Sequence, residues 1–351
     1  MKSVVVDKIA SVAQHNALGL ELRLSRDIPC EEGVLVAVRI LNNKSRYNQL
    51  ELTSGRMATI NQGDVIVGAL GHRKALRGYS GHLPKTLKPG DTIQVLNIGG
   101  VLGICDSANP DVGPPFDCEV LGTVLSFPYL GERIGVPARA GAYTLDVDAP
   151  IETNGVPVIA MAGTCMDSGK TAAACAIVGR LRHLGFRVAA CKATGVSLRR
   201  DVLAMEDAGA AQTMIFSDFG IVATTEANGP ELTRALLTGL AKNRPDVIVL
   251  ELGDGLLGAY GVGAILSDEA IRNSLTAVVL CANDPVSAWG GVQLLRTEFG
   301  IEPAIVTGPA TDNEVGVQQI DARTSLPAIN ALSNGVALGD KVASLLKKAA
   351  A

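Results

Sequence analysis

Aromatic residues are scarce in this sequence: six phenylalanines, five tyrosines and one tryptophan make up 3% of its 351 residues. Positive charge is not in excess, because 31 lysines and arginines stand against 35 aspartates and glutamates, for a formal net charge of -4. Surfaces that bind nucleic acid usually combine basic residues with aromatic rings on which bases stack. We therefore expect no nucleic-acid partner.

Long hydrophobic runs are also missing, although 47% of the residues are apolar. No run reaches the roughly 20 residues that cross a bilayer, because Asp246, Glu251 and Asp254 interrupt the most hydrophobic region. The first ten residues, MKSVVVDKIA, lack the apolar core of a signal peptide. These absences predict a cytoplasmic protein without a membrane partner.

The cysteines form no recognisable framework. Their number is odd, no C-x-x-C pair occurs, and they are scattered along the chain, at Cys30, Cys105, Cys118, Cys165, Cys175, Cys191 and Cys281. Neither a disulfide scaffold nor a zinc knuckle fits this spacing. We expect most of them to be small core residues.

The sequence pattern changes near residue 150, and the length of the chain also favours two domains. Residues 1–150 carry short β-prone runs separated by turn signals, namely VLVAVRIL, ATI, VIVGAL, TIQVLNI and VLGTVLSF. This pattern predicts a smaller, mostly β domain, either a barrel or a sandwich, with a substrate or a partner as its expected ligand. The polar stretch DAPIETNGVP, residues 148–157, is the expected linker.

From residue 151 to 351, apolar strand-like runs alternate with helical stretches. The runs are VIAMA, RVAACKA, DVIVLEL, TAVVLCA and PAIVTG, and the chain closes on GDKVASLLKKAAA, which resembles an amphipathic helix. Apolar strands separated by helices indicate a mostly parallel sheet covered on both faces. The predicted fold class is α/β, with a P-loop NTPase-like domain after the β domain.

The stretch AGTCMDSGKTAA lies between the first of these strands and the first helix. Such a loop offers free backbone amides and the positive end of a helix dipole to a phosphate. Lys170 would reach the β- and γ-phosphates, and the Thr171 hydroxyl would ligate Mg²⁺. The strict pattern needs glycine at position 164, where this chain has threonine. We still predict that nucleotide phosphates contact Gly163, Thr164, Cys165, Met166, Asp167, Ser168, Gly169, Lys170, Thr171 and Ala172.

This variant loop resembles that of the dethiobiotin synthetase-like group of P-loop NTPases, with the form G-T-x-x-[DE]-x-G-K-T. Three further segments resemble that group in the same order: CKATG at 191–195, LRRDVLA at 198–204 and DVIVLELGDGLL at 246–257. The resemblance implies that Lys192 binds the substrate and that Asp201 and Glu251 hold the metal. It also implies a homo-oligomer, since members commonly dimerise.

The layout equally resembles the DUF1611 family, two-domain proteins with a C-terminal P-loop domain. The corresponding segments are GTCMDSGK, KATG, ELGDG, GAYGVGAIL and VVLCANDP. Members have been linked to N-acylation of an amino acid. Their N-terminal domain is described as Rossmann-like, which the strand-rich residues 1–150 do not obviously match.

The acids near the loop each allow two interpretations. An unpartnered carboxylate at Glu251 would be costly to bury, but at the carboxyl edge of a parallel sheet it faces the ligand crevice, which favours a magnesium role over a solvated acid. Asp254 is the fallback ligand. Asp201 is either a metal ligand or the polar face of a short helix. Asp167 either orients the metal or an attacking group, or caps the helix.

Other polar residues fall at neighbouring strand ends. Lys192 and Thr194 would meet a substrate carboxylate or a phosphoryl group, although a simply exposed lysine is the alternative. Asn283 and Thr307 would flank the base, although turn chemistry explains them as well. The guanine motif N-K-x-D is absent, which favours ATP. Cys165 could be a nucleophile, but loop packing is the simpler role.

A cationic stretch in the first domain, residues 71–91, could bind an anionic substrate or be a solvated hairpin loop. It contains His72, Arg73, Lys74, Arg77, His82, Lys85 and Lys88.

Three functions remain open. The first is an ATP- and Mg²⁺-dependent ligase or synthetase acting on a small carboxylated or amino-acid-like substrate, with Lys170, Lys192 and Asp167 as catalytic residues. The second is an acyl transfer in which the loop holds coenzyme A or nucleotide phosphates. The third is a regulatory NTPase.

Overall fold

The computed structural model describes residues 1–76, 78–129, 131, 133–146 and 149–349. The chain divides into two compact units. The first contains Met1–Thr144, Val196–Arg200 and Phe216–Ala223, and the second contains Leu145–Gly195, Asp201–Ile215 and Thr224–Ala351. Two short segments from the C-terminal half therefore belong to the first unit. Residue 148, within the expected linker, lies outside the described residues.

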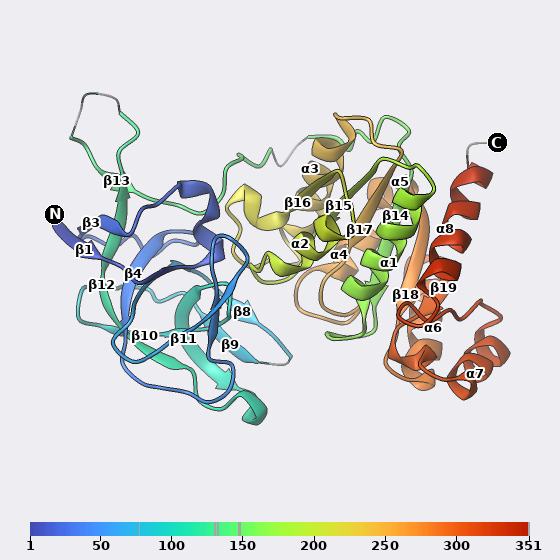
Figure 1. Ribbon diagram of the computed structural model, residues 1–351, viewed down its shortest axis with the longest axis horizontal. Helices are drawn as coiled ribbons and strands as arrows, with labels where there is room; N and C mark the ends of the chain where they lie inside the picture. Colours follow the sequence, from blue (N-terminus) through green and yellow to red (C-terminus); the bar gives the residue numbers. More distant parts are fainter. Residues whose placement is uncertain (77, 130, 132, 147–148, 350–351) are drawn as a thin grey trace. The chain divides into compact units, whose positions relative to one another are not determined.

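The first unit is built on a β-barrel (Figure 1). Strand β10 pairs with both β11 and β12, and the pairs β12–β4, β4–β7 and β7–β11 complete a closed ring. This closure decides between the two predicted arrangements in favour of the barrel. The ring strands are β4 (Leu35–Ile40), β7 (Val65–Leu70), β10 (Thr92–Val95), β11 (Val101–Ala108) and β12 (Phe116–Ser126).

The barrel interior is packed with aliphatic side chains, and β7 is buried at all of its positions. Its glycine is required, because a Cβ on Gly68 would lie 2.3 Å from the carbonyl oxygen of Gly100. The remaining elements of the unit are β1 (Lys2–Val5), β2 (Lys8–Ile9), η1 (Ser11–Asn16), β3 (Glu21–Ser25), β5 (Gln49–Glu51), β6 (Met57–Thr59), β8 (Arg73–Lys74), β9 (Tyr79–His82), η2 (Pro110–Val112), β13 (Val136–Pro137) and η3 (Phe216–Phe219).

The second unit holds a parallel sheet of six strands in the order β16-β15-β17-β14-β18-β19. The strands are β14 (Val158–Gly163), β15 (Val188–Lys192), β16 (Gln212–Ile215), β17 (Val247–Glu251), β18 (Leu275–Cys281) and β19 (Ile305–Thr307). Strands β14, β15 and β17 are buried at every position, as expected for strands covered on both faces. The predicted α/β fold class is confirmed.

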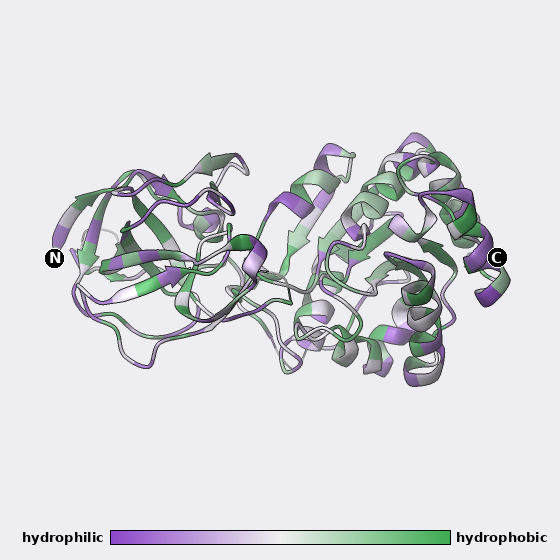
Figure 2. Ribbon diagram, turned by 90° about the horizontal axis from the view of Figure 1, so that it is seen from below, coloured by the Kyte–Doolittle hydropathy of each residue, from purple (hydrophilic) through white to green (hydrophobic). Residues whose placement is uncertain are grey.

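Helices cover this sheet. Helices α1 and α8 pack against each other, with α1 over β14, β15 and β17, whereas α3 packs over β15, β16 and β17. Figure 2 shows the hydrophobic residues concentrated on the strands and the hydrophilic ones on the outer helix surfaces. The helices are α1 (Lys170–His183), α2 (Arg200–Asp207), α3 (Gly229–Ala241), α4 (Val262–Ser267), α5 (Glu269–Ser274), α6 (Pro285–Phe299), η4 (Pro309–Thr311), α7 (Glu314–Thr324) and α8 (Gly335–Ala349).

The parallel arrangement gathers the carboxyl ends of the strands at one edge of the sheet. The segments that follow β14, β15, β17, β18 and β19 all leave from that edge. In open α/β sheets, ligands bind in the crevice outside the carboxyl ends of the strands. No helix in the described part of the chain is both long and apolar enough to span a bilayer.

Candidate functional site

The segment between β14 and α1 has the backbone shape of a phosphate-binding loop. Gly169 precedes the first helical residue with a φ of 87°, and Asp167 also adopts a left-handed φ of 59°. A Cβ on Gly163 would lie 2.4 Å from Oγ of Ser168. A larger residue at this strand end would displace the Ser168 and Lys170 side chains. Asp167 is not the helix cap, since Gly169 takes that position.

Lys170 turns back over the loop instead of pointing into solvent. Its Nζ donates hydrogen bonds to the carbonyl oxygens of Cys165 (2.9 Å) and Asp254 (2.6 Å) and to Oγ of Ser168 (3.3 Å). Only 6% of the residue is exposed. Burial lowers the pKa of the Lys170 ammonium, and the Glu251 carboxylate opposes that change. A lysine ammonium can exchange oxygen partners of this kind for phosphate oxygens.

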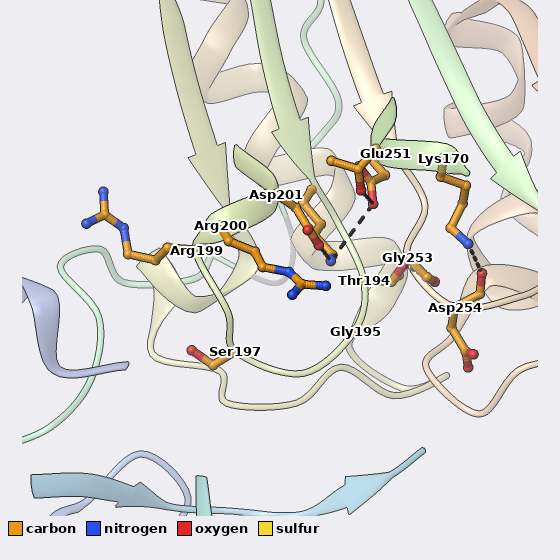
Figure 3. Close-up of polar contacts among 12 residues, drawn as sticks. Lys170, Thr194, Gly195, Ser197, Arg199, Arg200, Asp201, Glu251, Gly253 and Asp254 are labelled. Carbon is orange, nitrogen blue, oxygen red and sulfur yellow. Dashed lines mark hydrogen bonds and ion pairs between the residues drawn. The ribbon is translucent and has the colours of Figure 1, made fainter. Parts of the chain in front are cut away.

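The segment after β17 packs directly on the loop. Leu256 donates its amide to the Gly163 carbonyl at 2.9 Å, and a Cβ on Gly255 would lie 2.7 Å from the Thr164 carbonyl oxygen. Asp254, which directly precedes Gly255, has a φ of 74°, and its carbonyl oxygen accepts a hydrogen bond from Lys170 (Figure 3). The sequence carries no signal for this contact, because the acceptor is a backbone carbonyl, which every residue has.

Thr171, the second residue of α1, is joined to the end of β17. Its Oγ1 donates to Oε1 of Glu251 at 3.1 Å. Glu251 is 2% exposed. Burial raises the pKa of its carboxyl group, while Lys192, Lys170 and the hydrogen bond from Thr171 lower it. The hydroxyl and the acid predicted to share a metal are thus neighbours.

Lys192, the last residue of β15, brings a second ammonium to this edge. It forms an ion pair with Oδ2 of Asp201 in α2, and its Nζ lies 3.9 Å from Oε1 of Glu251. Figure 3 shows Asp201 and Glu251 on adjacent elements with their carboxylates turned toward the same space. The structure therefore brings together Lys170, Thr171, Lys192, Asp201 and Glu251.

The oxygen atoms at this position suit a magnesium ion. Oε2 of Glu251 is buried and, within the described residues, has no hydrogen-bond partner. Hydroxyl and carboxylate oxygens are the hard ligands that Mg²⁺ prefers, and in nucleotide sites one or two carboxylates normally act together with phosphates. No group of three or more His, Cys, Asp or Glu side chains fit to hold a metal exists among the described residues. Thr171, Glu251 and Asp201 would hold the ion together with phosphate oxygens.

The other residues that were predicted to bind a ligand differ in their hydrogen bonding. Thr194 is fully buried and donates its hydroxyl proton to the Gly253 carbonyl at 2.8 Å, so only its lone pairs are available to a substrate. Asn283 donates from Nδ2 to Sγ of Cys165 at 3.1 Å, which gives Cys165 a packing role in the loop. Oδ1 of Asn283 and Oγ1 of Thr307 are buried without a hydrogen-bond partner in the described part of the chain.

In the cationic stretch of the first unit, Arg73 and His82 are engaged by neighbouring residues. Arg73 is buried and donates to Tyr47 Oη at 2.9 Å and to the Leu96 carbonyl. His82 pairs with Asp106 at 2.7 Å. Arg77 lies outside the described residues. Arg73 therefore makes these contacts within the first unit, and the choice between an anion site and a solvated hairpin loop stays a prediction.

No protein-family model and no curated protein matches the chain. Solved structures do match. The chain is similar to the signal recognition particle receptor FtsY from Elizabethkingia anophelis (13% identity, 53% of this chain, 65% of that chain, TM-score 0.40). It is also similar to a DUF1611 family protein from Anabaena variabilis (17% identity, 59% of this chain, 62% of that chain, TM-score 0.42). A third similar structure is the hydrogenase maturation factor HypB from Archaeoglobus fulgidus (13% identity, 55% of this chain, 91% of that chain, TM-score 0.38).

The matched region spans less than two thirds of the first two structures. P-loop NTPases and a DUF1611 protein are thus among the structural neighbours, but at these TM-scores the likeness carries no functional information. The resemblance to the dethiobiotin synthetase-like group stays a prediction.

Proposed function

We propose that this protein is a P-loop ligase or synthetase that uses ATP and Mg²⁺ to activate a small carboxylated or amino-acid-like substrate by phosphoryl transfer. One observation carries the proposal: two lysines, Lys170 and Lys192, and the buried acid Glu251 meet at one sheet edge around the start of α1. Phosphoryl transfer depends mainly on positioning and charge stabilisation, and this set of groups supplies both.

Each residue has a separate task in this proposal. Lys170 and the amides from Gly163 to Ala172 bind the phosphate chain. Thr171 and Glu251, with Asp201, hold the magnesium ion, which neutralises charge on the phosphates when bound. Lys192 holds the substrate carboxylate near the terminal phosphate, a lone pair of Thr194 accepts a hydrogen bond from an amino group of the substrate, and Asp167 orients the attacking group from within the loop.

ATP is the proposed nucleotide because no N-K-x-D motif is present. Oδ1 of Asn283 and Oγ1 of Thr307 are the buried acceptors that support a base site beside the loop. We also propose that the protein is a cytoplasmic homo-oligomer, as its resemblance to dimerising NTPases implies, and that residues 1–150 bind a substrate or a partner.

The test is a thermal-shift series on the full chain with ATP, GTP and coenzyme A, each with and without Mg²⁺. A true ligand at about 100 times its Kd stabilises the folded state by about 2.7 kcal/mol. The proposal predicts the largest shift with ATP and Mg²⁺ together. Phosphate release should then rise when one member of a panel of small carboxylates and amino acids is added.

Two other outcomes would replace the proposal. Stabilisation by coenzyme A that is independent of Mg²⁺ would favour the acyl transfer implied by the DUF1611 resemblance. Tight nucleotide binding that no carboxylated substrate stimulates, together with nucleotide-dependent capture of a protein, would favour a regulatory NTPase.

A further inference from the structure

The ammonium of Lys192 occupies the position of a cation between two acids. It is ion-paired with Asp201 and lies 3.9 Å from Oε1 of Glu251. All three side chains are at most 14% exposed. In such a shielded place the two carboxylates need a positive charge beside them, because an uncompensated buried charge is strongly destabilising.

The same two carboxylates are the ones that fit a divalent cation. Oε1 of Glu251 accepts from Thr171, and Oε2 of Glu251 is buried without a partner among the described residues. A doubly charged ion that shares these oxygens with a phosphate chain would be repelled by an ammonium at the present distance. At about 4 Å this repulsion would weaken binding of such an ion by at least about tenfold even at the dielectric constant of water.

We infer that Lys192 is a built-in counter-ion that a divalent cation displaces from Asp201 and Glu251, so that metal binding frees the ammonium for an anionic substrate. This inference rests on the proposed function. The inference adds a binding order to the proposed function. Nucleotide and metal bind first, and only then does the substrate carboxylate gain Lys192 as its cationic partner. The stem of Lys192 lies on Gly253, where a Cβ would be 3.0 Å from Cε of the lysine. A side chain at that position would hinder such a movement.

Metal binding in the absence of nucleotide tests the inference directly. Mn²⁺ accepts the same oxygen ligands as Mg²⁺ and is counted by electron paramagnetic resonance. The full-length wild type is compared with Lys192→Met, Lys192→Gln and Lys192→Arg, and the exposed Lys341→Met is the matched control. Both neutral variants should bind Mn²⁺ at least about tenfold more tightly than wild type. Lys192→Arg and Lys341→Met should stay close to wild type.

A second substitution locates the effect. Adding Asp201→Asn to Lys192→Gln should reverse the gain in Mn²⁺ affinity, because it removes one of the two carboxylates. Equal or weaker Mn²⁺ binding by both neutral variants would overturn the inference, as would a gain that survives Asp201→Asn. If Lys192→Met does not fold, Lys192→Gln decides the result.

The outcome is separable from a failure of the proposed function. If nucleotide binding depends on Lys170 while the neutral variants show no gain in Mn²⁺ affinity, only the counter-ion inference fails. If wild type binds no nucleotide, the proposed function fails, whatever the Mn²⁺ result.

Discussion

Thr171 Oγ1 donates a hydrogen bond to Oε1 of Glu251 at 3.1 Å, and this contact ties the first turn of α1 to the end of β17. It connects the hydroxyl that follows the loop lysine with a buried acid that also lies 3.9 Å from the Lys192 ammonium. We expect Glu251→Gln to keep the acceptor for Thr171 and to remove the charge that holds the metal.

For Glu251→Gln, the affinity for ATP measured with Mg²⁺ by calorimetry should fall by about an order of magnitude, because one carboxylate no longer attracts the ion. The affinity for ATP without Mg²⁺ should change little. An unchanged affinity with Mg²⁺ would remove Glu251 from the metal site.

Within the first unit, the carboxylate of Glu51 is fully buried and accepts the backbone amides of Arg199 and Arg200, both at 2.7 Å. Glu51→Ala leaves both amides without this partner and should lower the free energy of unfolding by roughly 1–3 kcal/mol. Glu51→Gln retains one acceptor oxygen and should cost less. Chemical denaturation measures both, and equal losses would contradict this reading.

Asp254 provides a test of backbone strain, because its φ of 74° disfavours any side chain with a Cβ. Asp254→Gly should be more stable than Asp254→Ala by about 1 kcal/mol, since only glycine adopts this conformation without cost. Both variants keep the carbonyl that receives Lys170. Thermal unfolding of the pair without ligand gives the comparison, and a more stable alanine variant would argue against the left-handed conformation.

Asp268 gives the fold a pH dependence. Burial acts to raise the pKa of its carboxyl group, but the amide of Ile271 and the guanidinium of Arg234 outweigh burial and hold the pKa below its usual value. A lowered pKa in the folded state contributes stability above the pKa of the unfolded chain, about 3.9. That contribution is lost as the pH falls through the folded value.

Asp268→Asn should therefore be less stable than wild type at pH 7, and the difference should shrink as the pH is lowered through the acid range. Melting temperatures at several pH values measure it, with the exposed Glu269→Gln as control. A difference that stays constant with pH would show that the charge of Asp268 contributes nothing.

Local sequence signals were sufficient to predict many of the strands and helices of the second unit. The apolar runs at 247–251 and 275–281 predicted β17 and β18, because parallel strands are buried on both faces. The glycines and Lys170 predicted the loop before α1, since Gly169 has the left-handed conformation that glycine adopts without cost. The terminal helix was also predicted, although α8 begins at Gly335, four residues before the expected start.

Contacts between distant segments were not predictable in the same way. Every residue has a backbone carbonyl, so the sequence does not predict that the Asp254 carbonyl accepts a hydrogen bond from Lys170. The place of Val196–Arg200 in the first unit was not predicted for a similar reason, because contacts such as that between the Arg199 amide and Glu51 join segments far apart in the sequence. In the barrel, the pairing of β10 with two strands decided a closure that alternating apolar residues leave open.

The central claim is that Lys170 and the loop before α1 bind a nucleoside triphosphate. Calorimetric titration of ATP with Mg²⁺ into wild type, Lys170→Ala and the exposed control Lys242→Ala tests it most directly. We predict binding by wild type and Lys242→Ala, and a loss of at least about a hundredfold in affinity for folded Lys170→Ala, since a charge-assisted hydrogen bond to phosphate is worth about 1.5–3 kcal/mol and the buried ammonium makes more than one. Equal affinity of all three proteins would contradict the claim.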